Sequence, residues 1–140
     1  MSSFHIHVTT GAGAPIYRQI VDQVRLAVAT ETLSPGDALP SVRGLAEQLV
    51  INFNTVAKAY AELVREGVLE SLQGKGFFVA PKRQIYSQVE RLRRLRLAVD
   101  SFIHEAVFLD FSAEDIRKAV DEKLVELDWQ TKPLGEKNDY

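Results

Sequence analysis

The chain has 140 residues, a formal net charge of −2 and no cysteine. This length allows one or two small domains and excludes a large enzyme body. The absence of cysteine excludes disulfides, thiolate zinc sites and cysteine nucleophiles. No apolar run is long enough to cross a membrane, and the first residues lack a secretory signal, so we expect a cytoplasmic protein.

The charge is distributed unevenly. Residues 1–81 carry six Lys or Arg against seven Asp or Glu, residues 82–99 carry six against one, and residues 100–140 carry five against eleven. A basic segment therefore separates a near-neutral front part from an acidic C-terminal part. This argues against a protein that coats nucleic acid by bulk positive charge.

The first 31 residues predict a strand and a helix. Phe4, Ile6 and Val8 alternate with polar residues, which is the period of a half-buried strand. Pro15 suits the first turn of a helix, and apolar residues then recur at helical spacing to about Glu31.

Two further helices are predicted between residues 41 and 67. Ser41 is placed at the N-cap of the first, either Asn52 or Asn54 caps the second, and Gly67 ends it. The inward-facing residues are Val42, Leu45, Ala46 and Leu49 on the first helix and Val56, Tyr60, Leu63 and Val64 on the second. Tyr60 is interpreted as a core residue. Because about four residues join the helices, the pattern is typical of a helix-turn-helix.

A β-hairpin is predicted directly after these helices. Residues 68–72 and 77–79 have the composition of strands, and the turn between them, residues 73–76, places glycine on both sides of Lys75. A hairpin in this position is a wing.

The C-terminal part predicts two helices that dimerise. Apolar residues spaced alternately three and four apart indicate a long helix over 83–109 with a coiled-coil-like seam, and Ser112 begins a capping-box pattern for a last helix. The predicted dimerisation residues are Ile85, Leu92, Leu95, Val99, Phe102, Ala106 and Leu109 on the long helix and Ile116, Val120 and Leu124 on the last.

The expected fold class is α+β, mainly α with a small β wing. We assign residues 1–81 to a winged helix-turn-helix domain, 82–130 to a helical dimerisation domain and 131–140 to a flexible tail.

One side of the second helix of the helix-turn-helix is suited to contact DNA. Asn54, Lys58 and Ala61 lie opposite the buried stripe, where Asn can pair with adenine, Lys can reach guanine or phosphate, and Ala can contact a thymine methyl group. Thr55 and Arg43 are expected to contact backbone phosphates, and Lys75 is expected to enter the minor groove. The candidate DNA-binding residues are Ser41, Arg43, Asn52, Asn54, Thr55, Lys58, Gly74, Lys75 and Gly76.

The order of these motifs resembles the DNA-binding domain of the GntR family. The resemblance rests on residues 39–46, 52–60, 63–68 and 74–79 and covers about residues 14–80. The short two-helix remainder is similar to that of the YtrA-like subfamily, whose C-terminal part dimerises and lacks a large ligand-binding domain. The resemblance implies DNA contacts from Arg43, Asn54, Thr55, Lys58 and the wing residues 74–76.

Two residues depart from the family pattern. Gly44 replaces the acidic residue that commonly follows the arginine, and glycine weakens a helix by up to about 1 kcal/mol relative to alanine. Phe53 stands where the family usually has Arg or Pro, which puts a DNA contact at this position in doubt.

These features predict a transcriptional repressor that binds a pseudo-palindromic operator as a homodimer, with two reading helices about 34 Å apart and a steep salt dependence. The protein is expected to need no cofactor and not to be an enzyme. The alternative is a dimeric winged-helix adaptor that binds proteins and not DNA. A small-molecule effector is an open possibility, and the sequence names none.

Two further features have alternative interpretations. His5 and His7 face one side of the predicted strand, but without a third ligand we expect an exposed face and no metal site. The basic residues between Arg91 and Arg96 contact either DNA or the acidic last helix, of the same or a partner subunit, and we favour the helix because the intervening leucines belong to the seam.

Overall fold

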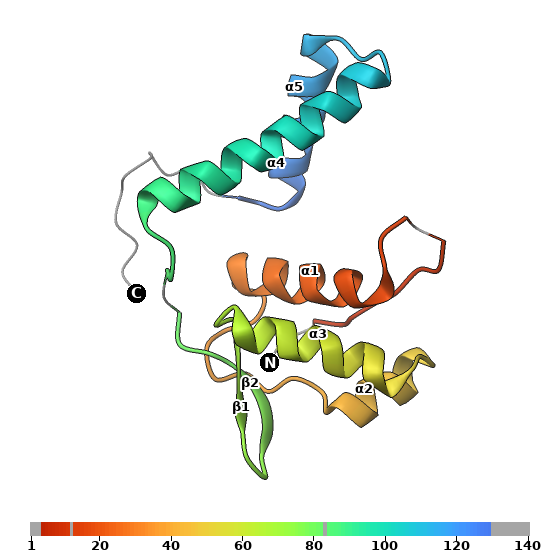
Figure 1. Cartoon of the computed structure of the whole chain (residues 1–140), viewed down its shortest axis with the longest axis vertical. Coiled ribbons are helices and arrows are strands. Elements are labelled where there is room, and N and C mark those ends of the chain that lie inside the picture. The colour runs from red at the N-terminus through yellow and green to blue at the C-terminus, as the bar shows by residue number, and fades with distance from the viewer. Residues whose placement is uncertain (1–3, 12, 83, 130–140) are drawn as a thin grey trace. The chain divides into compact units, whose positions relative to one another are not determined.

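A computed structural model describes residues 4–11, 13–82 and 84–129 (Figure 1). The chain divides between residues 83 and 84 into two compact units. The predicted flexible tail, residues 131–140, lies outside the described residues. No helix of the described part is long and apolar enough to cross a membrane.

The described part of the first unit contains three helices and one hairpin (Figure 1). The helices are α1 (Ile16–Ala29), α2 (Val42–Leu49) and α3 (Phe53–Arg65), and the strands are β1 (Leu69–Leu72) and β2 (Gly76–Val79). The two strands pair antiparallel, with Leu69 opposite Val79 and Leu72 opposite Gly76. The predicted fold class, mainly α with a small β wing, is confirmed.

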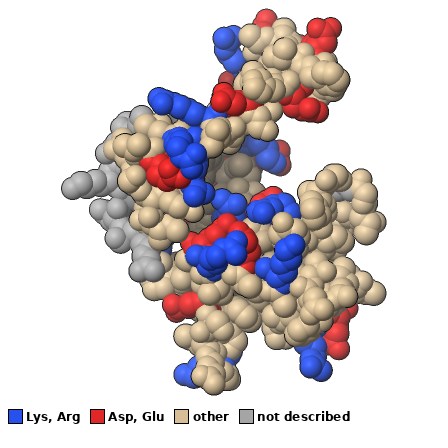
Figure 2. All heavy atoms as spheres, viewed as in Figure 1, with Lys and Arg blue, Asp and Glu red and all other residues tan. Residues whose placement is uncertain are grey.

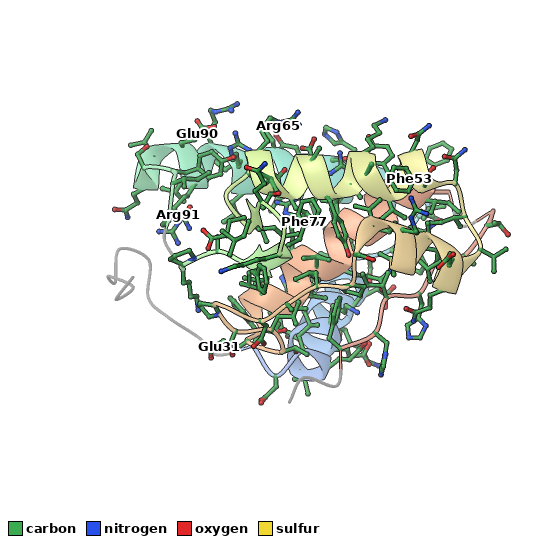
Figure 3. The ribbon with its side chains drawn as sticks, turned by 90° about the horizontal axis from the view of Figure 1, so that it is seen from below. Glu31, Phe53, Arg65, Phe77, Glu90 and Arg91 are labelled. Atoms are coloured by element: carbon green, nitrogen blue, oxygen red, sulfur yellow. The ribbon has the colours of Figure 1, made fainter. Side chains whose placement is uncertain are left out.

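The core of this unit lies between α3, its neighbouring helices and the wing. The largest fully buried side chains are Ile20, Val21, Val24, Leu45, Val56, Tyr60, Leu63, Leu69 and Val79. Tyr60 is a core residue, as predicted: its ring meets Phe77 edge-on at 4.9 Å between centroids, and its hydroxyl donates to the carbonyl of Pro40 at 2.7 Å. Figure 3 shows Phe77 below α3. The tyrosine therefore joins α3 to the wing and to the start of α2.

The helix ends of the helix-turn-helix are defined by local hydrogen bonds. The Ser41 hydroxyl accepts from the Gly44 N–H at 2.9 Å, and the Asn52 side chain accepts from the Asn54 N–H at 2.7 Å, so Asn52 rather than Asn54 caps α3. Between the helices, Val50 adopts a left-handed conformation with φ 56°. A Cβ at Gly44 would lie 2.9 Å from the Ser41 hydroxyl, so a larger residue there would require the Ser41 side chain to shift.

The predicted strand over residues 4–8 is wrong, although its burial pattern is observed. Ile6 is buried and His5 and His7 are exposed, but the segment forms no β-ladder. Side-chain amides of α1 take the place of a partner strand: Gln23 bonds both the N–H and the carbonyl of His7, and Gln19 bonds both groups of Thr9. An alternating apolar pattern indicates an extended backbone, but it cannot tell whether a partner strand or side-chain amides form the hydrogen bonds with that backbone.

The second unit contains α4 (Gln88–Phe108) and α5 (Ala113–Glu126). The predicted start of the long helix at residue 83 is wrong. Ser87 caps α4 by accepting from the Glu90 N–H at 3.1 Å, so Ile85 lies before the helix and not within its seam. Ser87 and Glu90, three residues apart, form a capping signal, but the regular apolar spacing continues before Ser87 and predicts an earlier start. The capping box predicted at Ser112 and Asp115 is confirmed.

The apolar residues of the second unit are mostly exposed. Ala106 is the only residue buried within the described part of this unit, whereas the first unit has a complete core. The predicted seam residues exposed to solvent are Leu95, Val99, Phe102 and Leu109 on α4 and its C-terminal end, and Val120 and Leu124 on α5. The two helices therefore do not form a core within one chain.

Candidate nucleic-acid interface

The outer face of α3 is polar. Val56, Ala59, Tyr60 and Leu63 are fully buried, whereas Asn54, Lys58 and Ala61 are exposed on the opposite side, where the sequence placed them. The Lys58 ammonium lies 3.8 Å from the ring centroid of Tyr17 on α1. Thr55 is half-buried. The outer face of α3 therefore presents the Asn54 amide at its N-terminal end and the Lys58 ammonium on the side of α1.

Two of the candidate DNA-binding residues already have a structural role. The oxygens of Ser41 and Asn52 accept hydrogen bonds from the first turns of α2 and α3. The Asn52 amide nitrogen is a separate donor and is not used by the cap. These residues thus orient the N-terminal ends of both helices, where Arg43 and Asn54 are located.

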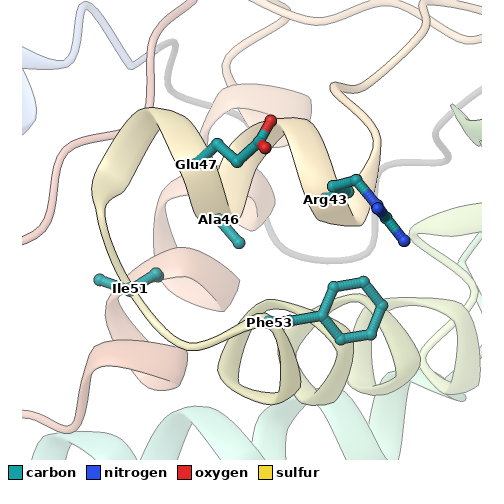
Figure 4. A pocket seen from close by; sticks show the side chains of 5 residues that line it. All are labelled: Arg43, Ala46, Glu47, Ile51 and Phe53. Atoms are coloured by element: carbon teal, nitrogen blue, oxygen red, sulfur yellow. The ribbon is translucent and has the colours of Figure 1, made fainter.

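A surface groove of about 470 Å³ lies between α2 and the start of α3 (Figure 4). It is lined by Arg43, Ala46, Glu47, Ile51 and Phe53. Figure 4 shows the Arg43 side chain extending toward the Phe53 ring, whereas the Glu47 carboxylate points away from it. The sequence pattern did not predict Phe53 as a site residue, because its position beside Arg43 depends on how α2 packs on α3.

The wing has the geometry of a tight, exposed loop. Gly74 and Gly76 have φ of 76° and 112°, which an L side chain rarely adopts, and the Lys75 N–H donates to the Leu72 carbonyl at 2.9 Å. The residues before α2 lie along the other edge of β2, because Leu39 N–H donates to the Phe77 carbonyl at 2.9 Å. The wing and the start of α2 are therefore held together.

The basic side chains of the first unit differ in whether a carboxylate neutralises them. Arg25 lies 3.6 Å from Glu66, and Arg65 pairs with Glu62, so these cations are neutralised along α1 and α3. Arg43 and Lys75 form no ion pair with any described residue. Figure 2 shows basic and acidic groups side by side over α1 and α3 and an acidic group next to the basic one at α2, whereas the basic group at the wing tip stands apart.

Two of the four arginines of α4 pair within their own helix. Arg93 and Arg94 both donate to Glu90, at 2.8 and 2.9 Å, and these hydrogen bonds lower the pKa of Glu90 to about 2. Arg94 also lies 3.9 Å above the Tyr86 ring. Within the described residues no ion pair joins α4 to α5, so the favoured pairing with the acidic last helix is not formed inside one chain.

The described residues contain no cluster of three His, Asp or Glu side chains that could hold a metal ion. Three helices with a capped turn, an exposed polar helix face and a glycine-flanked wing define instead a winged helix-turn-helix of the kind found in transcriptional regulators.

Comparison with known proteins identifies the family. The sequence pattern of "Bacterial regulatory proteins, gntR family" matches residues 16–79. The chain is 32% identical over 117 residues to the HTH-type transcriptional repressor YtrA of Bacillus subtilis, which covers 84% of this chain and 90% of YtrA. It is 34% identical over 106 residues to the uncharacterized HTH-type transcriptional regulator YhcF of the same organism, with 76% and 87% covered.

Solved structures agree with this assignment. The transcriptional antiterminator from Listeria monocytogenes EGD-e superposes with a TM-score of 0.79 at 31% identity, covering 96% of this chain and all of that one. YtrA from Sulfolobus acidocaldarius, a GntR-family transcription factor, superposes with a TM-score of 0.56 at 35% identity, covering 69% and 97%.

The chain belongs to the GntR family, and its similarity to YtrA-like regulators extends beyond the helix-turn-helix. These relatives are transcriptional regulators and not enzymes, in agreement with the expectation from the sequence.

Proposed function

We propose that the chain is a sequence-specific DNA-binding repressor of the cytoplasm that binds a pseudo-palindromic operator as a homodimer. The exposure of Arg43, Asn54 and Lys75 on α2, α3 and the wing of one compact unit carries this proposal. Two of these side chains are cations without a carboxylate partner among the described residues, so they are available to phosphates and base edges. The name of YtrA supports repression.

The exposed apolar surface of the second unit supports a homodimer. Soluble proteins rarely leave large apolar patches in contact with water, and a second copy of the same seam supplies a matching surface. A two-fold dimer presents two copies of α3 to successive turns of the major groove, about 34 Å apart. The operator is therefore expected to contain two inverted half-sites at that spacing.

DNA binding is tested by footprinting the full chain on the DNA upstream of its own gene, followed by titration of the protected fragment. Arg43→Ala and Lys75→Ala are each expected to weaken binding. Arg117→Ala, which removes an exposed cation from α5, is the matched control and leaves affinity unchanged. Absence of binding to any DNA, including that region, would contradict the proposal and favour the protein-binding adaptor.

Dimerisation is tested with two leucines of α4. Leu95 and Leu97 have similar exposed fractions, 57% and 55%, but two residues along a helix point about 200° apart, and only Leu95 belongs to the predicted seam. We expect Leu95→Arg to yield a monomer in light scattering and Leu97→Arg to remain a dimer. A wild-type monomer, or equal effects of both substitutions, would contradict the assigned seam.

A further inference from the structure

Phe53 is a large apolar residue that the fold itself does not use. It is the first residue of α3, and half of its side chain, 50%, is exposed. It belongs neither to the buried core nor to the partly buried apolar side chains that pack against that core. A phenylalanine in this position therefore stabilises the unit less than a core residue does, and its exposed half calls for another explanation.

The surroundings of Phe53 combine apolar surface with one free cation. Ala46 and Ile51 line the same groove, and the Arg43 side chain extends toward the ring (Figure 4). Arg43 has no ion-pair partner among the described residues, and Glu47, the one carboxylate of the groove, points away from the ring. The groove thus combines an apolar surface with a positive charge. This combination fits a DNA strand, which carries both phosphates and apolar base atoms, better than it fits a purely apolar or a cationic ligand.

The position of Phe53 along α3 narrows the choice of partner. In a helix-turn-helix the N-terminal residues of the second helix contact base edges in the major groove. The only apolar group that a base pair presents there is the C5-methyl group of thymine, and phenylalanine is among the side chains that contact it. The unit is also nearly neutral, so little of its affinity comes from bulk charge and individual base contacts matter more.

We infer that Phe53 is a specificity-determining residue that contacts the methyl group of one thymine in each operator half-site, while Arg43 binds the adjacent phosphate. This inference rests on the proposed function and adds a base preference to it.

The test exchanges single thymines for uracil in the footprinted operator. Uracil lacks only the methyl group and keeps the same base pair, so the exchange isolates the contact. With the full wild-type chain, one position per half-site is expected to lose about fourfold in affinity, which is the contribution of one buried methyl group. Phe53→Ala should bind the thymine operator more weakly and should bind the thymine and uracil operators equally at that position.

Two further variants guard against indirect effects. Phe53→Leu keeps an apolar side chain and should retain part of the thymine preference. Val50→Ala changes another exposed apolar residue of the turn, 88% exposed and outside the groove, and should retain all of it. Because Phe53 is half-exposed and lies outside the core, Phe53→Ala is also expected to stay folded, with a urea midpoint close to that of the wild type.

The outcomes separate this inference from the proposed function. If the wild-type chain binds its operator but no thymine-to-uracil exchange changes the affinity, the assignment of Phe53 is overturned and DNA binding stands. The same follows if Phe53→Ala keeps the full preference. If the chain binds no DNA, the proposed function itself fails.

Discussion

The Lys58 ammonium lies 3.8 Å from the centroid of the Tyr17 ring, so a cation of α3 rests on an aromatic residue of α1. Such contacts stabilise by about 0.5–1 kcal/mol at exposed sites. Phe53, five residues earlier on α3, lines the groove beside α2 instead. If Phe53 and Asn54 contact bases as proposed, we expect Lys58, which lies on the side of α1, to bind a phosphate and not a base.

The first prediction concerns this lysine. Lys58→Ala should weaken DNA binding by a similar factor for every sequence and make the slope of log affinity against log salt shallower by about 0.9, the value of one phosphate contact. Tyr17→Leu removes the ring but keeps the charge, so its salt slope should match the wild type. An unchanged slope for Lys58→Ala, measured by fluorescence anisotropy over a salt series, would exclude this role.

A second prediction concerns the buried hydroxyl of Tyr60. Burial raises the pKa of Tyr60, so the phenol stays neutral and donates to Pro40 throughout the physiological pH range. Tyr60→Phe should lower the free energy of unfolding by about 1 kcal/mol, because the hydrogen bond is lost and the Pro40 carbonyl loses its donor. Tyr86→Phe is the control and should leave urea unfolding unchanged; equal losses from both would argue against a specific role of the Tyr60 hydroxyl.

A third prediction follows from the conformation of Val50. Its φ of 56° and ψ of 51° are left-handed, which is unfavourable for a β-branched residue by about 1–2 kcal/mol. Val50→Gly should therefore stabilise the first unit by about 0.5–1 kcal/mol, since glycine relieves the strain at some entropic cost. Val64→Gly, within α3, should destabilise it. A lower urea midpoint for Val50→Gly would contradict the expected relief.

A fourth prediction concerns acid and the start of α4. Hydrogen bonds from Arg93 and Arg94 lower the pKa of Glu90 to about 2, so the stabilisation by Glu90 is complete above its ordinary value of 4.5 and is lost as the pH falls toward 2. Glu90→Gln should therefore show less loss of helicity between pH 4.5 and 2 in far-UV circular dichroism. Glu105→Gln, on the same helix, should follow the wild-type curve; identical curves for Glu90→Gln would refute the coupling.

Local sequence signals predicted most of the secondary structure because the responsible hydrogen bonds are short-range. The caps at Ser41 and Ser112 and the turn around Lys75 each depend on residues within four positions of one another. The same rule explains one error: Ser87 carries a local capping signal, whereas the apolar spacing continues back to Ile85 and predicts an earlier start for α4. The strand predicted at residues 4–8 is wrong because the Gln23 side chain, far along the chain, bonds the backbone of His7, and Gln19 does the same for Thr9 just beyond the segment.

The sequence by itself determined the helix-turn-helix, the wing and the polar face of α3, since periodicity and turn chemistry specify which residues are buried. Only the tertiary structure decided which side chains of different elements meet. The packing of α2 on α3 places Arg43 beside Phe53, and the packing of α1 on α3 places Tyr17 under Lys58. These pairs are separated by ten and 41 residues, and contacts at such distances depend on helix packing, which no local pattern encodes.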